Sequence, residues 1–210
     1  MKIISHRGVW GNTFNQNTKG ALQKSFLSGF GLETDIRDYK GALVISHDIA
    51  DNNSISIDDY FDIINKCDEN NMYINALNIK ADGLQNKLLK KLSKYKIKNY
   101  FVFDMSVPDT LGYIEKEINF FTRQSDIETN PVFYEESSGV WMDGFYYDWI
   151  KENDINKHLD NGKMVCLVSP ELHKRSYNKF WEQLRCIKNI RNNKIILCTD
   201  FPYKAKEYFK

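Results

Sequence analysis

Two histidines and two acidic residues near the start of the chain have the types and the spacing that acid–base and cation chemistry require. His6 and His47 can each change protonation state near neutral pH, so together they could take a proton from an attacking oxygen and return one to a leaving oxygen. Glu33 and Asp35 stand two apart, which places both carboxylates on the same side of a strand, here the inner side. Paired oxygen ligands suit a hard divalent cation, Mg2+ or Ca2+, better than zinc.

Two basic residues suit the binding of an oxyanion. The Arg7 guanidinium can grip a phosphate with two parallel hydrogen bonds, and Lys80 can add a point charge. The chain as a whole is nearly neutral, with 29 Lys plus Arg against 28 Asp plus Glu. This balance gives no general attraction for nucleic acid or anionic lipid. We therefore expect local recognition of a small anionic molecule and no nucleic-acid partner.

Short runs rich in β-branched and aromatic residues alternate with helix-like stretches, which is typical of repeated βα units around a parallel sheet. The expected strands are Lys2–Ser5, Phe30–Ile36, Tyr73–Ile79, Tyr100–Asp104, Ile118–Thr122, Val140–Phe145, Met164–Val168 and Lys194–Cys198. The expected helices are Thr18–Ser28, Ile57–Glu69, Leu84–Tyr95, Pro108–Glu117, Glu152–Asn161, Tyr177–Asn189 and Pro202–Phe209.

This order of elements predicts an α/β fold, a single (β/α)8 TIM barrel with one domain over residues 1–210, although periodicity alone would also allow an open doubly wound sheet. The barrel is favoured because polar residues follow every expected strand, and the active site of a barrel is built from the loops at those strand ends. A small β-hairpin extension is expected after the second strand, where Asp38-Tyr39-Lys40-Gly41 has turn chemistry and Ala42–Ser46 alternates. No helix is expected over Gln124–Glu136, which shows little periodicity.

Several short motifs occur in order, each at an expected strand end or helix start. The chain reads Ser5-His6-Arg7-Gly8, Gln16-Asn17-Thr18, Glu33-Thr34-Asp35, Gly41, His47-Asp48 and, more loosely, Asn78-Ile79-Lys80 and Cys198-Thr199-Asp200-Phe201-Pro202. This series resembles the signature of the glycerophosphodiester phosphodiesterase family: H-R-G, E-N-T, E-x-D, H-D and E-[IL]-K. The resemblance is strongest over the first quarter of the chain, and several spaced matches are far more specific than one.

The resemblance implies a metal-dependent phosphodiesterase acting on a small phosphodiester. His6 and His47 would then be the catalytic acid–base pair, Arg7 and Lys80 would bind phosphate, and Glu33 and Asp35 would be metal ligands. Asn78 stands where the family has a third carboxylate ligand; its amide can donate a carbonyl oxygen but carries no charge. We prefer Mg2+ to Ca2+ because magnesium commonly keeps several waters and needs few protein ligands.

Four further residues near the expected site have open roles. Asn17 is assigned to substrate binding, where it would orient the site, but it could equally belong to a helix cap. Gln16 replaces the Glu of E-N-T. Asp104 either completes the metal site or pairs with Lys80 and orients it, and Glu171 is assigned to substrate binding at the end of the seventh strand.

The remaining features bear on the setting of the protein. The N-terminus turns polar too early for a signal peptide, and no apolar run approaches the length of a membrane span, so neither secretion nor membrane insertion is expected. The four cysteines show no C-x-x-C spacing and are interpreted as reduced thiols of a cytoplasmic protein. His158 is expected on a solvated helix surface, and His173 could contact the substrate.

Two other functions remain open beside hydrolysis of a glycerophosphodiester-like substrate. A lyase similar to phospholipase C or sphingomyelinase D would use the same two histidines to form a cyclic phosphate. A binding module that has lost efficient turnover would account for Gln16 and Asn78. Retention of both histidines and of Glu33 and Asp35 argues against the binding module. The sequence does not predict an oligomeric state.

Overall fold

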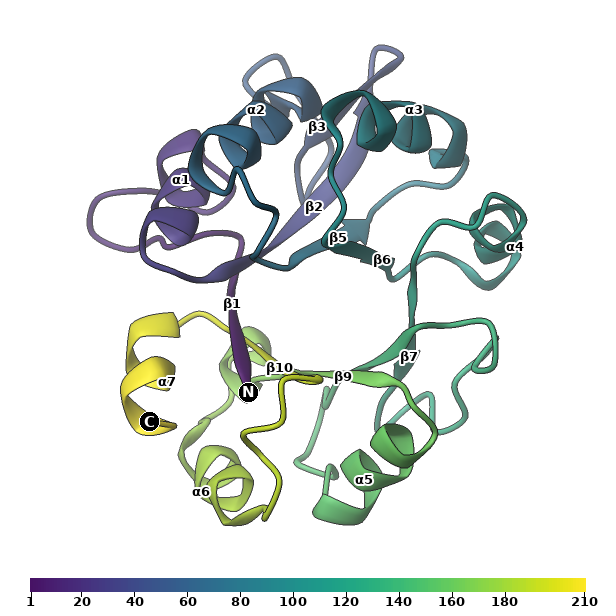
Figure 1. Ribbon diagram of the computed structural model, residues 1–210. Coiled ribbons are helices and arrows are strands. Elements are labelled where there is room, and N and C mark those ends of the chain that lie inside the picture. The colour runs from purple at the N-terminus through teal and green to yellow at the C-terminus, as the bar shows by residue number, and fades with distance from the viewer. The chain divides into compact units, whose positions relative to one another are not determined.

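The computed structural model describes residues 1–210 and contains ten strands and seven α-helices. The strands are β1 (Lys2–His6), β2 (Gly31–Tyr39), β3 (Ala42–Ile45), β4 (Ile55–Ser56), β5 (Asn75–Ile79), β6 (Tyr100–Phe103), β7 (Phe121–Gln124), β8 (Gly139–Met142), β9 (Met164–Val168) and β10 (Ile195–Thr199). The helices are α1 (Lys19–Leu27), α2 (Ile57–Cys67), α3 (Gln85–Tyr95), α4 (Val107–Glu115), α5 (Glu152–Asp160), α6 (Asn178–Cys186) and α7 (Pro202–Tyr208), with a short 3-10 helix η1 (Pro170–His173). Strand and helix alternate along most of the chain (Figure 1).

The contacts within the chain define two compact units. One unit is residues 5–120, and the other is residues 1–4 together with residues 121–210. The single domain expected over the whole chain stays a prediction. No helix of the chain is both long and apolar enough to pass through a membrane.

In the unit of residues 5–120, β2 is the central strand of a mixed sheet. It pairs in parallel with β5, which pairs in parallel with β6, and it pairs antiparallel with β3. The register places Asp35 opposite Asn78 and Ile36 opposite Ile79. The parallel pairs bring the carboxyl ends of β2, β5 and β6 to one edge of this sheet. Helices α1, α2 and α3 follow in turn from purple to teal in Figure 1.

The predicted hairpin is confirmed as β2 and β3. Lys40 and Gly41 join the two strands with φ values of 47° and 80°. Two consecutive residues in the left-handed region are the mark of a type I′ turn, whose twist matches that of an antiparallel pair. Strand β4 pairs antiparallel with β3. It was not predicted, because a strand of two residues is too short to show a periodic pattern.

The starts of α1, α2 and α4 follow capping residues of the sequence. Thr18 caps α1 by accepting a hydrogen bond from the backbone N–H of Ala21 at 3.4 Å, and Ser56 caps α2 by accepting from Asp59 N–H at 3.1 Å. Ser106 caps α4, with Pro108 in the first turn. These caps explain why the helices begin within one or two residues of the predicted positions.

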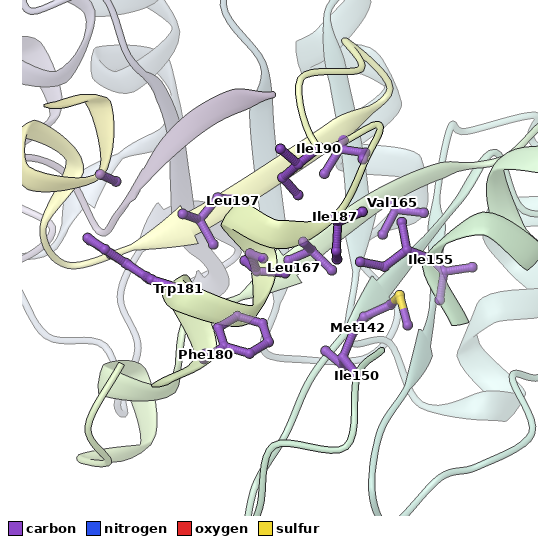
Figure 2. Packing of buried hydrophobic residues seen from close by; sticks show 14 residues of the cluster. Met142, Ile150, Ile155, Val165, Leu167, Phe180, Trp181, Ile187, Ile190 and Leu197 are labelled. Carbon is purple, nitrogen blue, oxygen red and sulfur yellow. The ribbon is translucent and has the colours of Figure 1, made fainter. Parts of the chain in front are cut away.

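In the other unit, β7, β8, β9 and β10 pair in sequence order, and all three pairs are parallel. Helices α5, α6 and α7 pack their apolar residues against these strands. Figure 2 shows the cluster, to which Ile155 of α5, Phe180 and Trp181 of α6, and Leu167 and Leu197 of the sheet belong. Burial of these side chains holds the strand ends of this unit in place.

Two predicted strands are displaced in the structure. Strand β7 begins at Phe121, three residues later than expected. Strand β8 ends at Met142 rather than Phe145, because the carboxylate of Asp143 accepts a hydrogen bond from Gly144 N–H at 2.8 Å and turns the chain. The stretch from β7 to β8 contains no helix, as predicted.

Candidate functional site

Five of the predicted site residues lie on or directly after three strands of the unit of residues 5–120. His6 ends β1 and Arg7 follows it, Glu33 and Asp35 belong to β2, and Lys80 follows β5. The backbone N–H of Arg7 donates to the carbonyl of Glu33 at 2.8 Å, so the end of β1 is held beside β2. Strand pairing therefore positions these five residues.

Glu33 is a buried carboxylate, only 1% exposed. Its Oε2 lies 3.3 Å from the backbone N–H of Arg7, which donates to it, and 3.9 Å from Nε2 of His6. Burial, and after it the neighbouring charge of Asp35, raises the pKa of Glu33 to about 7 against the smaller opposing effects of His6, Arg7 and Lys80. Without a further cation, this carboxyl group holds its proton up to near neutral pH.

Asp35 is fully buried and is the centre of a charge cluster. Its Oδ2 lies 2.9 Å from Nε of Arg7, although that N–H is not aligned for a hydrogen bond, and accepts a 2.9 Å hydrogen bond from Nδ2 of Asn17. Its Oδ1 lies 3.6 Å from Nζ of Lys80, too far for a hydrogen bond. When Glu33 is ionised, the two cations Arg7 and Lys80 and the two carboxylates Glu33 and Asp35 balance in formal charge.

The backbone fixes the two basic residues. Arg7 has a φ of 56°, in the left-handed region, and its Nη1 donates to Oε1 of Gln16 at 3.3 Å. Gly8 follows with a φ of 92°, and a Cβ there would lie 2.6 Å from the carbonyl carbon of Ala21, so only glycine fits. The carbonyl of Lys80 accepts from Nη2 of Arg37 at 2.9 Å.

Asn78 is buried opposite Asp35 in the register of β2 and β5, so both side chains leave the same face of the sheet. Oδ1 of Asn78 and Oδ1 of Asp35 are both buried without a hydrogen-bond partner. Buried oxygens are rarely left unpaired, and two on one face suit the binding of a hard cation. No three His, Cys, Asp or Glu side chains form a metal-binding group. The residues that could hold a cation are therefore Glu33 and Asp35 together with the amide oxygen of Asn78, and the predicted Mg2+ stays a prediction.

Asp104 directly follows β6 and has a φ of 65°. Asn78 is the register partner of Phe103, so Asp104 comes one residue beyond the level of Asn78 on the neighbouring strand. A left-handed residue at a strand end redirects its side chain, and aspartate tolerates this conformation better than most residues. Both roles predicted for Asp104 stay predictions.

His47 lies in the loop after β3 and is exposed. Its Nδ1 is 2.8 Å from Oδ1 of Asp48, and this hydrogen bond lowers the pKa of Asp48. This contact engages Nδ1 of the ring, and the catalytic role predicted for His47 stays a prediction. This contact between His47 and Asp48 was not predicted from the sequence, although the position of Asp48 directly after His47 could have indicated it.

A cavity of about 330 Å³ brings His47 together with Arg7 and Asn17. Its lining residues are polar except for Ile45; they are Arg7, Gln16, Asn17, Thr18, Ile45, Ser46, His47, Asp48, Asp51, Asn53 and Ser54. The volume is at the lower end of the range for small-molecule sites. The cavity therefore has room for a small polar molecule beside one predicted catalytic residue and one predicted phosphate-binding residue.

Glu171 belongs to the other unit, in η1 after β9. Its carboxylate accepts hydrogen bonds from the hydroxyls of Ser169 and Thr199 and from the backbone N–H of Asp200, the last at 3.1 Å. These bonds tie the end of β9 to the end of β10. The substrate-binding role predicted for Glu171 stays a prediction.

The two remaining histidines also lie in this unit. His158 is buried, which contradicts the predicted solvated position: its Nδ1 is 2.9 Å from the hydroxyl of Tyr134 and its Nε2 is 2.7 Å from Oε1 of Gln124. Both partners are far away in sequence, so the polar helix pattern around His158 gave no sign of them. His173 lies 2.6 Å from Oδ1 of Asp143.

Comparison of the structure with solved proteins identifies the fold of the chain. A solved glycerophosphodiester phosphodiesterase from Agrobacterium tumefaciens matches with a TM-score of 0.69 at 15% identity, covering 99% of this chain and 97% of its own. A glycerophosphoryl diester phosphodiesterase from Parabacteroides distasonis matches with a TM-score of 0.63 at 16% identity, covering 99% and 85%. The chain has the fold of these enzymes. The α/β class and the (β/α)8 TIM barrel predicted from the sequence are thereby confirmed.

The same fold is found in a protein of another activity. A mutant tryptophan synthase α-subunit from Pyrococcus furiosus matches with a TM-score of 0.59 at 13% identity, covering 98% of this chain and 90% of its own. No family model and no curated protein sequence matches the chain. Fold alone therefore does not assign an activity, and the residues of the site must do so.

Proposed function

We propose that this protein is a phosphodiesterase that hydrolyses a small glycerophosphodiester-like diester, with His6 and His47 as the acid–base pair. The observation that carries the proposal is the charge cluster of Arg7, Lys80 and Asp35 beside Glu33. Such a cluster is costly to bury unless a ligand or function uses it. The two phosphodiesterases among the structural neighbours support the proposal through their fold.

Arg7 and Lys80 would bind the phosphoryl oxygens. Both side chains are partly exposed, at 17% for Arg7 and 21% for Lys80, while the carboxylate between them is fully buried. The buried carboxylate of Asp35 thus holds the partly exposed side chains of Arg7 and Lys80 in place. A phosphodiester carries one negative charge and would be attracted to this pair, with Arg7 able to give a bidentate contact.

The two histidines would supply proton transfer. Hydrolysis of a phosphodiester requires one group to take a proton from the attacking water and one to give a proton to the leaving alkoxide. His6 is partly exposed beside Glu33, and His47 lines the polar cavity together with Arg7. We assign no direction to the pair: either histidine could be the base, with the other as the acid.

A divalent cation, Mg2+ rather than Ca2+, would be held by Glu33, Asp35 and Asn78. When bound, it would stabilise negative charge on the phosphoryl oxygens. The unpartnered oxygens of Asp35 and Asn78 support this assignment, and so does the raised pKa of Glu33, which burial and the charge of Asp35 cause and which a bound cation would lower. Three protein ligands suit magnesium, which commonly keeps several waters.

The proposal is tested by a panel of glycerophosphodiesters and nucleotide-linked diesters, each assayed with EDTA, MgCl2 or CaCl2. We expect turnover of at least one glycerophosphodiester that depends on MgCl2. Product analysis separates the two reaction types, because a hydrolase yields a phosphomonoester and a lyase yields a cyclic phosphate. Absence of turnover across the panel in all three conditions would contradict the proposal.

A further inference from the structure

Both ends of the Asn17 side-chain amide are bound within the protein. Its Nδ2 donates to Oδ2 of Asp35 at 2.9 Å, and its Oδ1 accepts from the hydroxyl of Thr34 at 2.8 Å. Thr34 and Asp35 are consecutive on β2, and both are fully buried. One amide therefore clamps two adjacent residues of the central strand.

The backbone holds this clamp in an unusual conformation. Asn17 has a φ of 55°, and its N–H donates to the carbonyl of Arg7 at 2.9 Å. Arg7 also has a positive φ, of 56°. For residues other than glycine this conformation costs roughly 1 kcal/mol, although asparagine tolerates it best. Two such residues joined by a hydrogen bond show that the chain is held in place here by its surroundings.

The clamp determines which oxygen of Asp35 stays free. Oδ2 is engaged by Asn17 and lies next to the Arg7 guanidinium, whereas Oδ1 has no hydrogen-bond partner. That oxygen lies near Lys80 and on the same face as Asn78. Rotation of the carboxylate would break the bond to Asn17 and change the distance to both cations.

We infer that Asn17 is a positioning residue, which fixes the carboxylate of Asp35 for cation and phosphate binding and does not itself bind substrate. This inference rests on the proposed function; it keeps the orienting role that the sequence suggested for Asn17 and replaces the assignment to substrate binding. The helix cap was the other role considered, and in the structure the neighbouring Thr18 provides it. Partners that orient a metal ligand in this way typically contribute 10- to 100-fold to metal affinity or activity.

The test is Asn17→Gly, because glycine keeps the positive φ without strain and removes only the amide. Asn71→Gly is the matched control: Asn71 has a φ of 50°, and its Oδ1 accepts from Lys98 N–H at 3.1 Å, in the turn before β5. Thr34→Val is a second variant that removes one anchor of the clamp with little change in shape. Urea unfolding verifies that each variant is folded.

Calorimetric titration with MgCl2 and steady-state kinetics provide the two readouts. We expect Asn17→Gly to weaken Mg2+ binding by about 10- to 100-fold and to lower kcat with little change in KM. Thr34→Val should have the same two effects to a smaller extent. Asn71→Gly should match wild type in both the Kd for Mg2+ and kcat. If Asn17→Gly raises KM but leaves the Kd for Mg2+ unchanged, Asn17 contacts substrate and the inference is wrong. The same holds if wild type binds no Mg2+. A wild type that binds Mg2+ but cleaves no diester contradicts the proposed function alone, and the Kd values then decide the role of Asn17.

Discussion

Asp35 and Asn78 lie opposite each other on the parallel strands β2 and β5, and each has a buried side-chain oxygen without a hydrogen-bond partner. If these oxygens hold a cation with Glu33, a negative charge at position 78 should strengthen the site. We predict that Asn78→Glu lowers the Kd for Mg2+ by about tenfold or more, since one added ion contact of roughly 1.4 kcal/mol has that effect. Calorimetric titration measures the change, and an unchanged Kd would remove Asn78 from the ligand set.

Asp104→Asn in the same titration separates the two roles predicted for Asp104. If Asp104 completes the metal site, the variant should bind Mg2+ more weakly, and the double variant with Asn78→Glu should recover the affinity. If Asp104 only orients Lys80, the Kd for Mg2+ should match wild type.

Removal of either histidine should impair catalysis and leave the fold intact. We predict that His6→Ala and His47→Ala each lower turnover by roughly 10^2- to 10^4-fold, the range for loss of one acid–base group. His47 is exposed, so its variant should unfold at the wild-type urea concentration. A variant that keeps more than about a third of the wild-type rate would show that its histidine has another role.

The buried carboxyl of Glu33 should make the metal-free protein less stable as the pH rises. Its pKa is raised from 4.5 to about 7, so the folded protein keeps a proton that the unfolded chain releases. Stability is then full below pH 4.5 and falls as the pH rises to about 7, by on the order of 3 kcal/mol. Glu33→Gln should remove this loss of stability. Urea unfolding in the presence of EDTA at several pH values measures the difference between the variant and wild type.

The control for this experiment is Glu69→Gln, an exposed glutamate of the same unit, which should follow wild type. Added MgCl2 at pH 8 should stabilise wild type and not Glu33→Gln, because the cation binds the ionised carboxylate. If the stability of wild type and of Glu33→Gln depends on pH in the same way, ionisation of Glu33 does not cause the loss of stability.

His158 should have the opposite pH dependence. Burial lowers its pKa from 6.5, so folding disfavours the protonated ring; Nε2–H donates to Oε1 of Gln124. The stability from this neutral ring is present above pH 6.5 and is lost as the pH falls below it, by up to about 1.4 kcal/mol per pH unit. His158→Gln should flatten the fall between pH 7 and pH 5 in urea unfolding. An unchanged slope would assign the acid sensitivity to another group.

The sequence predicted the fold well because its signals are local. Alternation of strand and helix patterns gave every helix, and the Tyr39-Lys40-Gly41 turn gave the β2–β3 hairpin. The short strand β4 and the late start of β7 were missed. Both depend on pairing with other strands rather than on the pattern of their own residues.

The sequence predicted individual residues of the candidate site but not the contacts between them. Motif spacing identified Glu33, Asp35 and Lys80, yet the ion pair of Asp35 with Lys80 depends on the register of β2 with β5. The ion pair of Asp35 with Arg7 depends on the hydrogen bond that holds the end of β1 beside β2. The clamp by Asn17 depends on a left-handed backbone that no composition signal reveals. Contacts between residues far apart in sequence are what pattern analysis cannot supply.

The central claim is that this chain cleaves a phosphodiester by means of His6 and His47. The most direct measurement is phosphorus NMR of a glycerophosphodiester incubated with wild-type protein and MgCl2, beside His6→Ala and His47→Ala. The account predicts that wild type replaces the diester signal with that of a phosphomonoester, and that each variant leaves it almost unchanged over the same time. An unchanged diester signal with wild type, or equal conversion by wild type and both variants, would contradict it.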